Sequence, residues 1–233
     1  MRIGILSDIH ANAPALKAVL RAAKKRNVSK LLCCGDFIGY YYDPSLVIDL
    51  LDEWDWIGVS GNHEAMLLDW LSNKNRKKIQ KKYGSGIHLA SKKLSKRNVQ
   101  RLIKMSSFIK LRIENYRILL CHGSPWDRDF YVYANSKKKI IDKMFNYDPD
   151  FDILFFGHTH YTFYLNKDNK QLINPGSVGQ PRDRKPGASW VIWDTKLNDV
   201  KFLREKYDNS QVVNMCRKYD PELKYLEEVL KRK

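Results

Sequence analysis

The sequence predicts an α/β protein in which a mixed β-sheet, or two packed sheets, is covered by helices. Three short apolar runs, at residues 2–7, 30–34 and 56–59, are separated by helical patterns, so the first sixty residues are predicted to be β-α-β-α-β. The first predicted helix has Asn12 as a candidate N-cap and Pro14 in its first turn. Asp43-Pro44 marks the start of the second predicted helix. This alternation is typical of a sheet whose faces are covered by helices.

The rest of the chain continues the mixture of strands and helices. Strands are predicted at residues 117–121, 152–156, 163–165, 171–174, 189–194 and 200–203, and helical patterns fill residues 64–105, 137–147 and 210–231. The late strands are joined by short connections, which indicates antiparallel pairing after a parallel first half. With 233 residues and no repeat or linker, the chain is expected to form a single domain over residues 1–233.

The composition predicts a cytoplasmic protein that does not enter a membrane. The four cysteines show no C-x-x-C spacing, and three of them lie in or at the end of apolar runs, where a thiol behaves as a small hydrophobe. No run approaches the roughly 18 apolar residues of a membrane span. The first residues pass directly into a predicted strand instead of a signal peptide, so we expect a reducing compartment.

Positive charge is concentrated in one segment. The formal net charge is +16, and residues 71–110 alone contain thirteen Lys and Arg and no Asp or Glu. This segment belongs to a basic helical cap insertion predicted at about residues 65–110. Its field would attract a nucleotide or nucleic acid if the cap overlooks the functional site. A solvated helical surface explains the same charge, and the sequence leaves both interpretations open.

Five of the six histidines lie in a set of short motifs that also supplies Asp, Asn and Glu, and each motif follows a predicted strand. The motifs are Asp8-Ile9-His10, Gly35-Asp36, Gly61-Asn62-His63-Glu64, Cys121-His122-Gly123 and Gly157-His158-Thr159-His160. Loops at the carboxyl ends of strands converge on one crevice in an open α/β sheet, so we expect these side chains to meet. A lone Asp-x-His is common by chance, but the last motif and Gly-Asn-His-Glu together are far more specific.

The residue types in these motifs predict a metal site. Imidazole with carboxylate suits manganese, iron, zinc or nickel better than calcium or magnesium. Eight candidate groups exceed the three or four protein ligands of a single catalytic zinc. Two ions that share a bridging carboxylate would use them, and would clamp the attacking and leaving oxygens of a displacement at phosphorus.

In this order, the motifs resemble the D-x-H, GD, GNH[DE], H and GHxH pattern of the calcineurin-like metallophosphoesterase superfamily, over about residues 1–195. The segment from Ile173 to Asp183 and Ala188-Ser189-Trp190 resemble a small bacterial and archaeal phosphodiesterase-like branch. The resemblance implies a four-layer sandwich of mixed β-sheets flanked by helices. It also implies a binuclear phosphoesterase in which a metal-bridging hydroxide attacks phosphorus.

The resemblance also assigns roles to individual residues. It implies one ion held by Asp8, His10, Asp36 and His160, and a second held by Asp36, Asn62, His122 and His158, with Asp36 as the bridge. His63 is then free of metal, and we expect it to donate a proton to the leaving-group oxygen. Manganese is the expected metal, with iron, zinc and nickel as alternatives.

Departures from the family pattern bear on the substrate. Protein phosphatases of this superfamily carry GDxxDRG and RGNHE, whose arginines grip the phosphate. Gly39, Tyr40 and Ser60 stand at the corresponding Asp and Arg positions here, which argues against a protein phosphatase. We expect Arg128 and Arg182 to bind the phosphate instead, with Arg184 and the basic segment as further sources of charge.

The favoured function is a phosphodiesterase or a nucleotide phosphatase. Aromatic residues in two loops, at 40–42 and 126–131, could stack a base beside the metals. The alternatives are a phosphomonoesterase, a nucleic-acid-binding module, and a non-catalytic scaffold such as the retromer subunit, which keeps this fold but has lost ligands. The complete set of candidate ligands argues against the scaffold. The sequence does not determine whether the protein forms a homo-oligomer.

Overall fold

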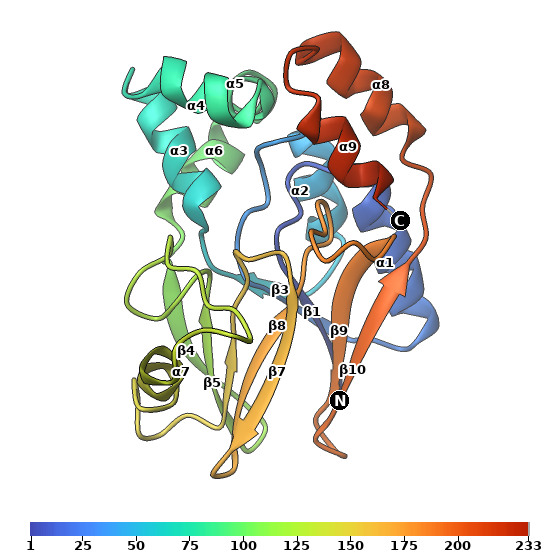
Figure 1. Ribbon diagram of the computed structural model, residues 1–233. Helices are drawn as coiled ribbons and strands as arrows, with labels where there is room; N and C mark the ends of the chain where they lie inside the picture. The colour runs from blue at the N-terminus through green and yellow to red at the C-terminus, as the bar shows by residue number, and fades with distance from the viewer. Residues whose placement is uncertain (233) are drawn as a thin grey trace.

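Two five-stranded sheets pack face to face between helices in the computed structural model, which describes residues 1–232 (Figure 1). The first sheet has the order β10-β9-β1-β2-β3 and contains β1 (Arg2–Leu6), β2 (Lys30–Cys33), β3 (Trp56–Gly58), β9 (Ala188–Asp194) and β10 (Asp199–Glu205). The second has the order β4-β5-β6-β8-β7 and contains β4 (Phe108–Ile113), β5 (Tyr116–Cys121), β6 (Ile153–Phe155), β7 (Thr162–Lys167) and β8 (Lys170–Pro175). The predicted α/β class with mixed sheets is confirmed.

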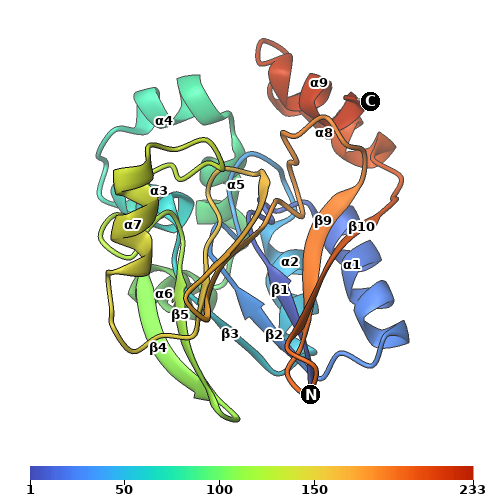
Figure 2. The same ribbon diagram turned by 60° about the horizontal axis from the view of Figure 1, so that its bottom comes forward.

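Helices cover the outer faces of both sheets and produce four layers (Figure 2). The helices are α1 (Ala13–Lys25), α2 (Pro44–Asp52), α3 (Asn62–Leu71), α4 (Arg76–Tyr83), α5 (Gly86–Lys93), α6 (Lys96–Lys104), α7 (Lys138–Phe145), α8 (Ser210–Tyr219) and α9 (Tyr225–Lys231). Apolar residues of α1, α2 and α3 form one core with the first sheet, and α7 packs on the second. A third cluster fills the space between the sheets, with Ile5, Leu32, Leu120 and Phe155 among its members. Strands β1 and β6 are therefore buried on both faces, which explains their continuous apolar runs.

The second sheet corrects the predicted strand pairing. Strands β6 and β8 are parallel, although the short connections among the late strands predicted antiparallel pairing. Strands β5 and β6 are also parallel. The chain between β5 and β6 contains α7, and the step from β6 to β8 passes over β7, which pairs antiparallel with β8 on its other side. The antiparallel prediction holds for β7–β8 and β9–β10.

The basic segment forms three helices, α4, α5 and α6, and then enters a strand. Residues 64–105 were predicted as helical, and α3 to α6 occupy this region, but β4 was not predicted and follows within the expected insert. The C-terminal pattern also divides, into α8 and α9, with Pro221 between them. Proline lacks the N–H that would continue the helix, and its ring clashes with the preceding turn.

The C-terminal helices contact the basic cap beyond the carboxyl ends of the strands (Figure 1). Tyr225 Oη donates to Lys82 O at 2.7 Å, and Asp220 accepts hydrogen bonds from Ser85 N and Tyr42 Oη, each at 2.9 Å. These contacts join α4 and α5 to α8 and α9.

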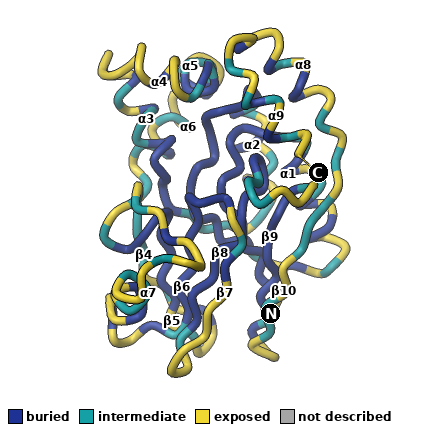
Figure 3. The backbone as a smooth tube through the Cα atoms, in the orientation of Figure 1, coloured by how far each residue is buried: buried dark blue, intermediate teal, exposed yellow. Residues whose placement is uncertain are grey.

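Several loops at the same end are buried, which is unusual for connecting segments. Every residue from 31 to 42 is buried, as are residues 153–160 (Figure 3). Buried backbone must find hydrogen-bond partners inside the protein, so these loops are held in defined conformations. Within residues 1–232, no helix combines the length and apolar character that crossing a membrane requires.

Candidate metal centre

The strand ends bring the predicted ligands together. Asp8 follows β1, Asp36 follows β2, His122 follows β5 and His158 follows β6, while Asn62 begins α3 after β3. All five are buried, as are His10 and His160. Because β1, β2 and β3 are parallel, and β5 and β6 are parallel, the side chains of each sheet meet at one edge, as predicted.

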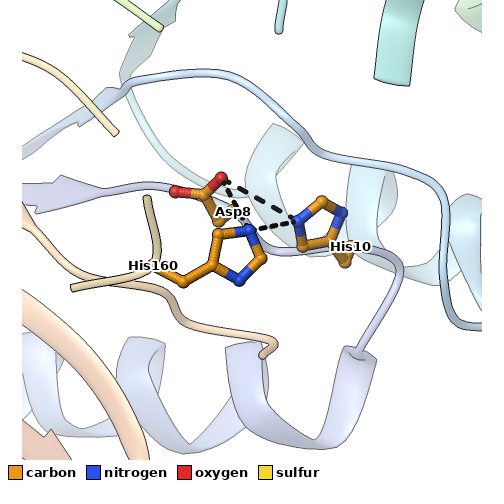
Figure 4. Close-up of side chains that lie close together, drawn as sticks. All are labelled: Asp8, His10 and His160. Atoms are coloured by element: carbon orange, nitrogen blue, oxygen red, sulfur yellow. Dashed lines mark hydrogen bonds and ion pairs between the residues drawn. The ribbon is translucent and has the colours of Figure 1, made fainter. Parts of the chain in front are cut away.

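The first group contains Asp8, His10 and His160 (Figure 4). His10 Nε2 lies 3.1 Å from His160 Nε2, and Asp8 Oδ1 lies 3.3 Å from His160 Nε2 and 3.8 Å from His10 Nε2. Two imidazole nitrogens and one carboxylate oxygen therefore face a common point, as metal ligands do.

The second group contains Asp36, Asn62, His122 and His158. His122 Nε2 lies 3.2 Å from Asp36 Oδ2, 3.1 Å from Asn62 Oδ1 and 3.2 Å from His158 Nδ1. Asp36 Oδ2 is also 3.7 Å from His10 Nε2 in the first group. The Asp36 carboxylate thus lies between the two groups.

Backbone carbonyls determine which ring nitrogens face inward. The Nδ1 atoms of His10, His122 and His160 lie 3.2, 2.6 and 2.6 Å from the carbonyl oxygens of Ile38, Cys34 and Gln180. A carbonyl only accepts, so each Nδ1 carries the hydrogen, which leaves Nε2 of a neutral ring with its lone pair toward the centre.

The His158 ring is turned the other way, but it also directs a nitrogen with a free lone pair toward the centre. Its Nε2 lies 3.1 Å from the carbonyl oxygen of Asp129 and donates to it, so Nδ1 faces His122. The carbonyl partners of these four histidines lie in distant loops, and the sequence motifs gave no indication of them.

This donor set fits a divalent metal. Asp8 Oδ1 is buried without a hydrogen-bond donor, although Asp8 Oδ2 accepts from His158 N at 3.1 Å. Burial lowers the pKa of His10 and His160 and brings that of His158 to about 4, which favours the neutral rings that bind metals. Burial opposes charge on His122 too, but the adjacent Asp36 carboxylate raises its pKa to about 10. A cation between these groups would replace that proton.

Glu64 holds the loops that carry Asp36 and Asn62. Its Oε2 accepts from Gly61 N at 2.7 Å and Asp36 N at 3.0 Å, and its Oε1 accepts from Phe37 N at 2.9 Å and Ile38 N at 3.3 Å. The sequence placed Glu64 in a motif but assigned it no role. One buried carboxylate therefore satisfies four backbone donors in two loops.

Close backbone approach explains two of the motif glycines. A Cβ at Gly61 would lie 2.1 Å from Asp36 Oδ1, and one at Gly157 would lie 1.8 Å from Ser7 Oγ. Any side chain at these positions would displace a strand-end loop. The glycines are thus required by the packing of the motifs against one another.

His63 lies beside both groups without belonging to either predicted ligand set. Its Nε2 is 4.0 Å from Asp36 Oδ2, its ring centre is 4.6 Å from that of His10, and its Nδ1 is buried without a hydrogen-bond partner. Burial lowers the pKa of His63 to about 4. Gly39 leaves room for the ring, since a Cβ there would lie 1.9 Å from His63 Nδ1.

The two predicted phosphate-binding arginines form hydrogen bonds with Tyr40 and Ser60, the residues that stand at the two arginine positions of the protein-phosphatase pattern. Arg182 Nη2 donates to Tyr40 Oη at 3.0 Å, and Arg128 Nη1 donates to Ser60 Oγ at 3.4 Å. Tyr40 also packs on the metal site, with its ring centre 4.7 Å from those of His10 and His63.

The predicted stacking role is wrong for Tyr41 and Tyr42. Tyr41 and Tyr42 are fully buried, and their hydroxyls donate to Leu226 O and Asp220 Oδ2 of the C-terminal segment. Trp126 and Phe130 pack against the core under α7. Among the aromatic residues of this second loop, Tyr131 is the exposed one, at 46 %.

A two-sheet α/β sandwich with buried His, Asp and Asn at its strand ends defines the metallophosphoesterase class. The chain belongs to the calcineurin-like phosphoesterase superfamily, whose domain matches residues 1–198. This confirms the resemblance seen in the motifs. The matched region ends before β10, α8 and α9.

Known relatives agree with this assignment. The chain is 34 % identical over 222 residues to the uncharacterized protein MJ0912 of Methanocaldococcus jannaschii, covering 88 % of each chain. It is 23 % identical over 181 residues to phosphodiesterase MJ0936 of the same organism, covering 76 % of this chain and 83 % of that protein. The crystal structure of a metallophosphoesterase from Sphaerobacter thermophilus matches with a TM-score of 0.81 and 28 % identity, over 100 % of this chain and 99 % of the other.

Replacement of Glu64 by glutamine tests whether this carboxylate holds the site. We expect Glu64→Gln to lower the free energy of unfolding by about 2–3 kcal/mol, since the amide nitrogen would face backbone N–H groups that need an acceptor. Urea denaturation of the metal-free variant measures this change, and elemental analysis should show reduced metal content. The exposed Glu222→Gln serves as control. An unchanged unfolding midpoint and full metal content in Glu64→Gln would contradict the assignment.

Proposed function

We propose that the protein is a binuclear metal-dependent phosphoesterase that hydrolyses phosphodiesters or nucleotides. The observation that carries this proposal is the convergence of two His-Asp groups on Asp36, whose Oδ2 lies 3.7 Å from His10 Nε2 and 3.2 Å from His122 Nε2. Similarity to the phosphodiesterase of M. jannaschii supports diesters as substrates. A scaffold without catalysis would not require seven buried donors in this arrangement.

The two groups would hold two ions. Asp8, His10, Asp36 and His160 are the proposed ligands of one, and Asp36, Asn62, His122 and His158 those of the other. Manganese is our first choice, with iron, zinc and nickel also suited to these ligands. Bound ions of this kind supply a nucleophile near neutral pH and neutralise charge on a phosphoester.

Arg128 and Arg182 are the proposed phosphate ligands. Each is hydrogen-bonded to one of the residues, Ser60 and Tyr40, that replace the arginines of the protein-phosphatase pattern. A guanidinium held at one nitrogen keeps other N–H donors for phosphate oxygens. The charge of Arg182 also acts on His160 and His63, which supports a position next to the site.

His63 is the proposed proton donor to the leaving group. Its position, with Nε2 4.0 Å from Asp36 Oδ2, supports this role. The ring is neutral in the free protein, but the negative charge of a bound phosphoester would favour its protonated form. Its Nε2 would then carry a proton next to the substrate.

The basic cap approaches the site through the end of α4. Tyr83 has its ring centre 5.2 Å from that of His63, and Lys82 Nζ lies 4.8 Å from the Tyr83 ring. Other cap lysines have structural contacts, since Lys93 Nζ donates to Tyr42 O at 2.8 Å. Binding of nucleic acid by the segment, self-association and a cytoplasmic location stay predictions from the sequence.

Hydrolysis of chromogenic substrates tests the proposed function. We expect about two metal ions per chain and manganese-stimulated hydrolysis of bis(p-nitrophenyl) phosphate ahead of p-nitrophenyl phosphate. Asp36→Asn should reduce turnover at least about 100-fold, since it weakens the group shared by both ions. The exposed Asp49→Asn is the matched control. Bound metal without hydrolysis of any phosphoester would favour the scaffold.

Removal of the His63 side chain tests its role as proton donor. His63→Ala keeps the backbone N–H that donates to Asp36 Oδ1 at 2.9 Å, so both metals should remain. We expect turnover to fall roughly 100-fold or more on diesters with alkyl leaving groups, and far less on those with a p-nitrophenolate leaving group, which departs without a proton. Equal losses on both substrates, or no loss, would remove the assignment.

Replacement of Arg182 tests its proposed role in binding the phosphate. Arg182→Gln should raise KM for a diester about tenfold or more, because a charge-assisted hydrogen bond is lost. Metal content should not change, and the exposed Arg21→Gln on α1 should behave as the unmodified protein. A KM that is equal in both variants would show that Arg182 does not contact the substrate.

A further inference from the structure

Three exposed tyrosines form a row that starts at the metal centre. Tyr131, Tyr133 and Tyr161 are 46, 36 and 41 % exposed. The Tyr131 ring centre lies 4.1 Å from that of the proposed metal ligand His158. Tyr131 stacks on Tyr133 with the centres 5.9 Å apart and the planes 8° from parallel, and Tyr133 meets Tyr161 edge to face at 5.8 Å.

A groove of about 510 Å³ lies beside this row. It is lined by Val132, Tyr133, Ala134, Asn135, Thr159, Tyr161, Thr162 and Phe163. Tyr133 lines the groove and stacks on Tyr131, which lies against His158, so the tyrosine row connects the groove to the metal centre. Its lining residues are apolar, aromatic or neutral polar, unlike the charged cluster beside it.

We infer that this groove binds the nucleobase of a nucleotide phosphoester while the phosphate lies at the metals. This inference rests on the proposed function and names its substrate class. Aromatic faces stack on any base, and exposed tyrosines in a row are available for stacking, unlike the buried Tyr41 and Tyr42. Asn135 places an amide along the same groove, where heteroatoms of a base need partners.

The position of the row separates this subsite from the phosphate grip. Arg182 is held by Tyr40 and Gln180, and Arg128 by Ser60, so the cations contact residues outside the groove. A ligand with phosphate at the metals and a flat uncharged group in the groove would match both environments. A simple phosphate monoester without an aromatic group would contact only the metals and leave the groove empty.

Two diesters with the same leaving group test the inference. Thymidine 5′-(p-nitrophenyl) phosphate should have a lower KM than methyl p-nitrophenyl phosphate with the metal-loaded protein. Tyr133→Ala and Tyr161→Ala should each raise KM for the thymidine substrate about tenfold or more and leave that of the methyl substrate unchanged. Tyr164→Ala is the control, because Tyr164 is 48 % exposed on β7 and packs toward Phe202.

The outcomes distinguish failure of the proposed base-binding groove from failure of the proposed function. An equal rise in KM for both substrates would mean that the nitrophenyl ring occupies the groove, and unchanged values would mean that no aromatic group does; either result overturns the inference. If the unmodified protein hydrolyses neither diester, the proposed phosphodiesterase activity fails, and calorimetric titration with thymidine 5′-monophosphate then tests the groove alone. Weaker binding by Tyr133→Ala and Tyr161→Ala than by Tyr164→Ala supports it, and equal binding overturns it.

Discussion

The metal centre depends on one buried carboxylate that belongs to neither ligand group. Glu64 accepts hydrogen bonds from the backbone of residues 36–38 and from Gly61, and so ties the loop after β2 to the start of α3. Without this link, Asp36 and Asn62 would lie on loops whose buried N–H groups lack an acceptor. The carboxylate thereby fixes the two loops relative to each other and holds Asp36 between the two groups of candidate ligands.

The ligands themselves sit in a strained backbone. Asp8, His10, Asp36, His158 and His160 have φ between 52 and 68°, in the left-handed region that residues other than glycine rarely occupy. Each such residue costs roughly 1 kcal/mol or more. Buried hydrogen bonds from Asp8 N, His10 N and Gly157 N to neighbouring loops hold these conformations. The unfavourable backbone conformations fall on the candidate ligands. Their energetic cost must be offset by other interactions in the fold, which thereby keep the side chains directed toward one another.

The sequence predicted those features that follow from a local hydrophobic pattern. It did not predict the features that depend on contacts between residues far apart in the chain. Apolar runs located β1, β2 and β5, and the common edge of parallel strands then predicted that Asp8, Asp36 and His122 would meet. Strand β4 was missed because its alternating pattern, with Lys110 and Arg112 between apolar residues, continues the charge of the basic helices. The pairing of Arg128 with Ser60 joins residues 68 positions apart and depends on the relative placement of two sheets, which no local pattern encodes.

Tyr40 connects the metal centre to parts of the chain that lie outside the matched superfamily domain. Its hydroxyl accepts from Arg182, its ring packs on His10 and His63, and it lies edge to face with Tyr225 of α9 at 6.4 Å. Tyr225 in turn donates to Lys82 O of the cap. Arg182, the proposed phosphate ligand, is thus held by a tyrosine that α9 and α4 support. The ligands come from the strand ends, whereas substrate selection is assigned to side chains brought together by the loops, the cap and the C-terminal helices.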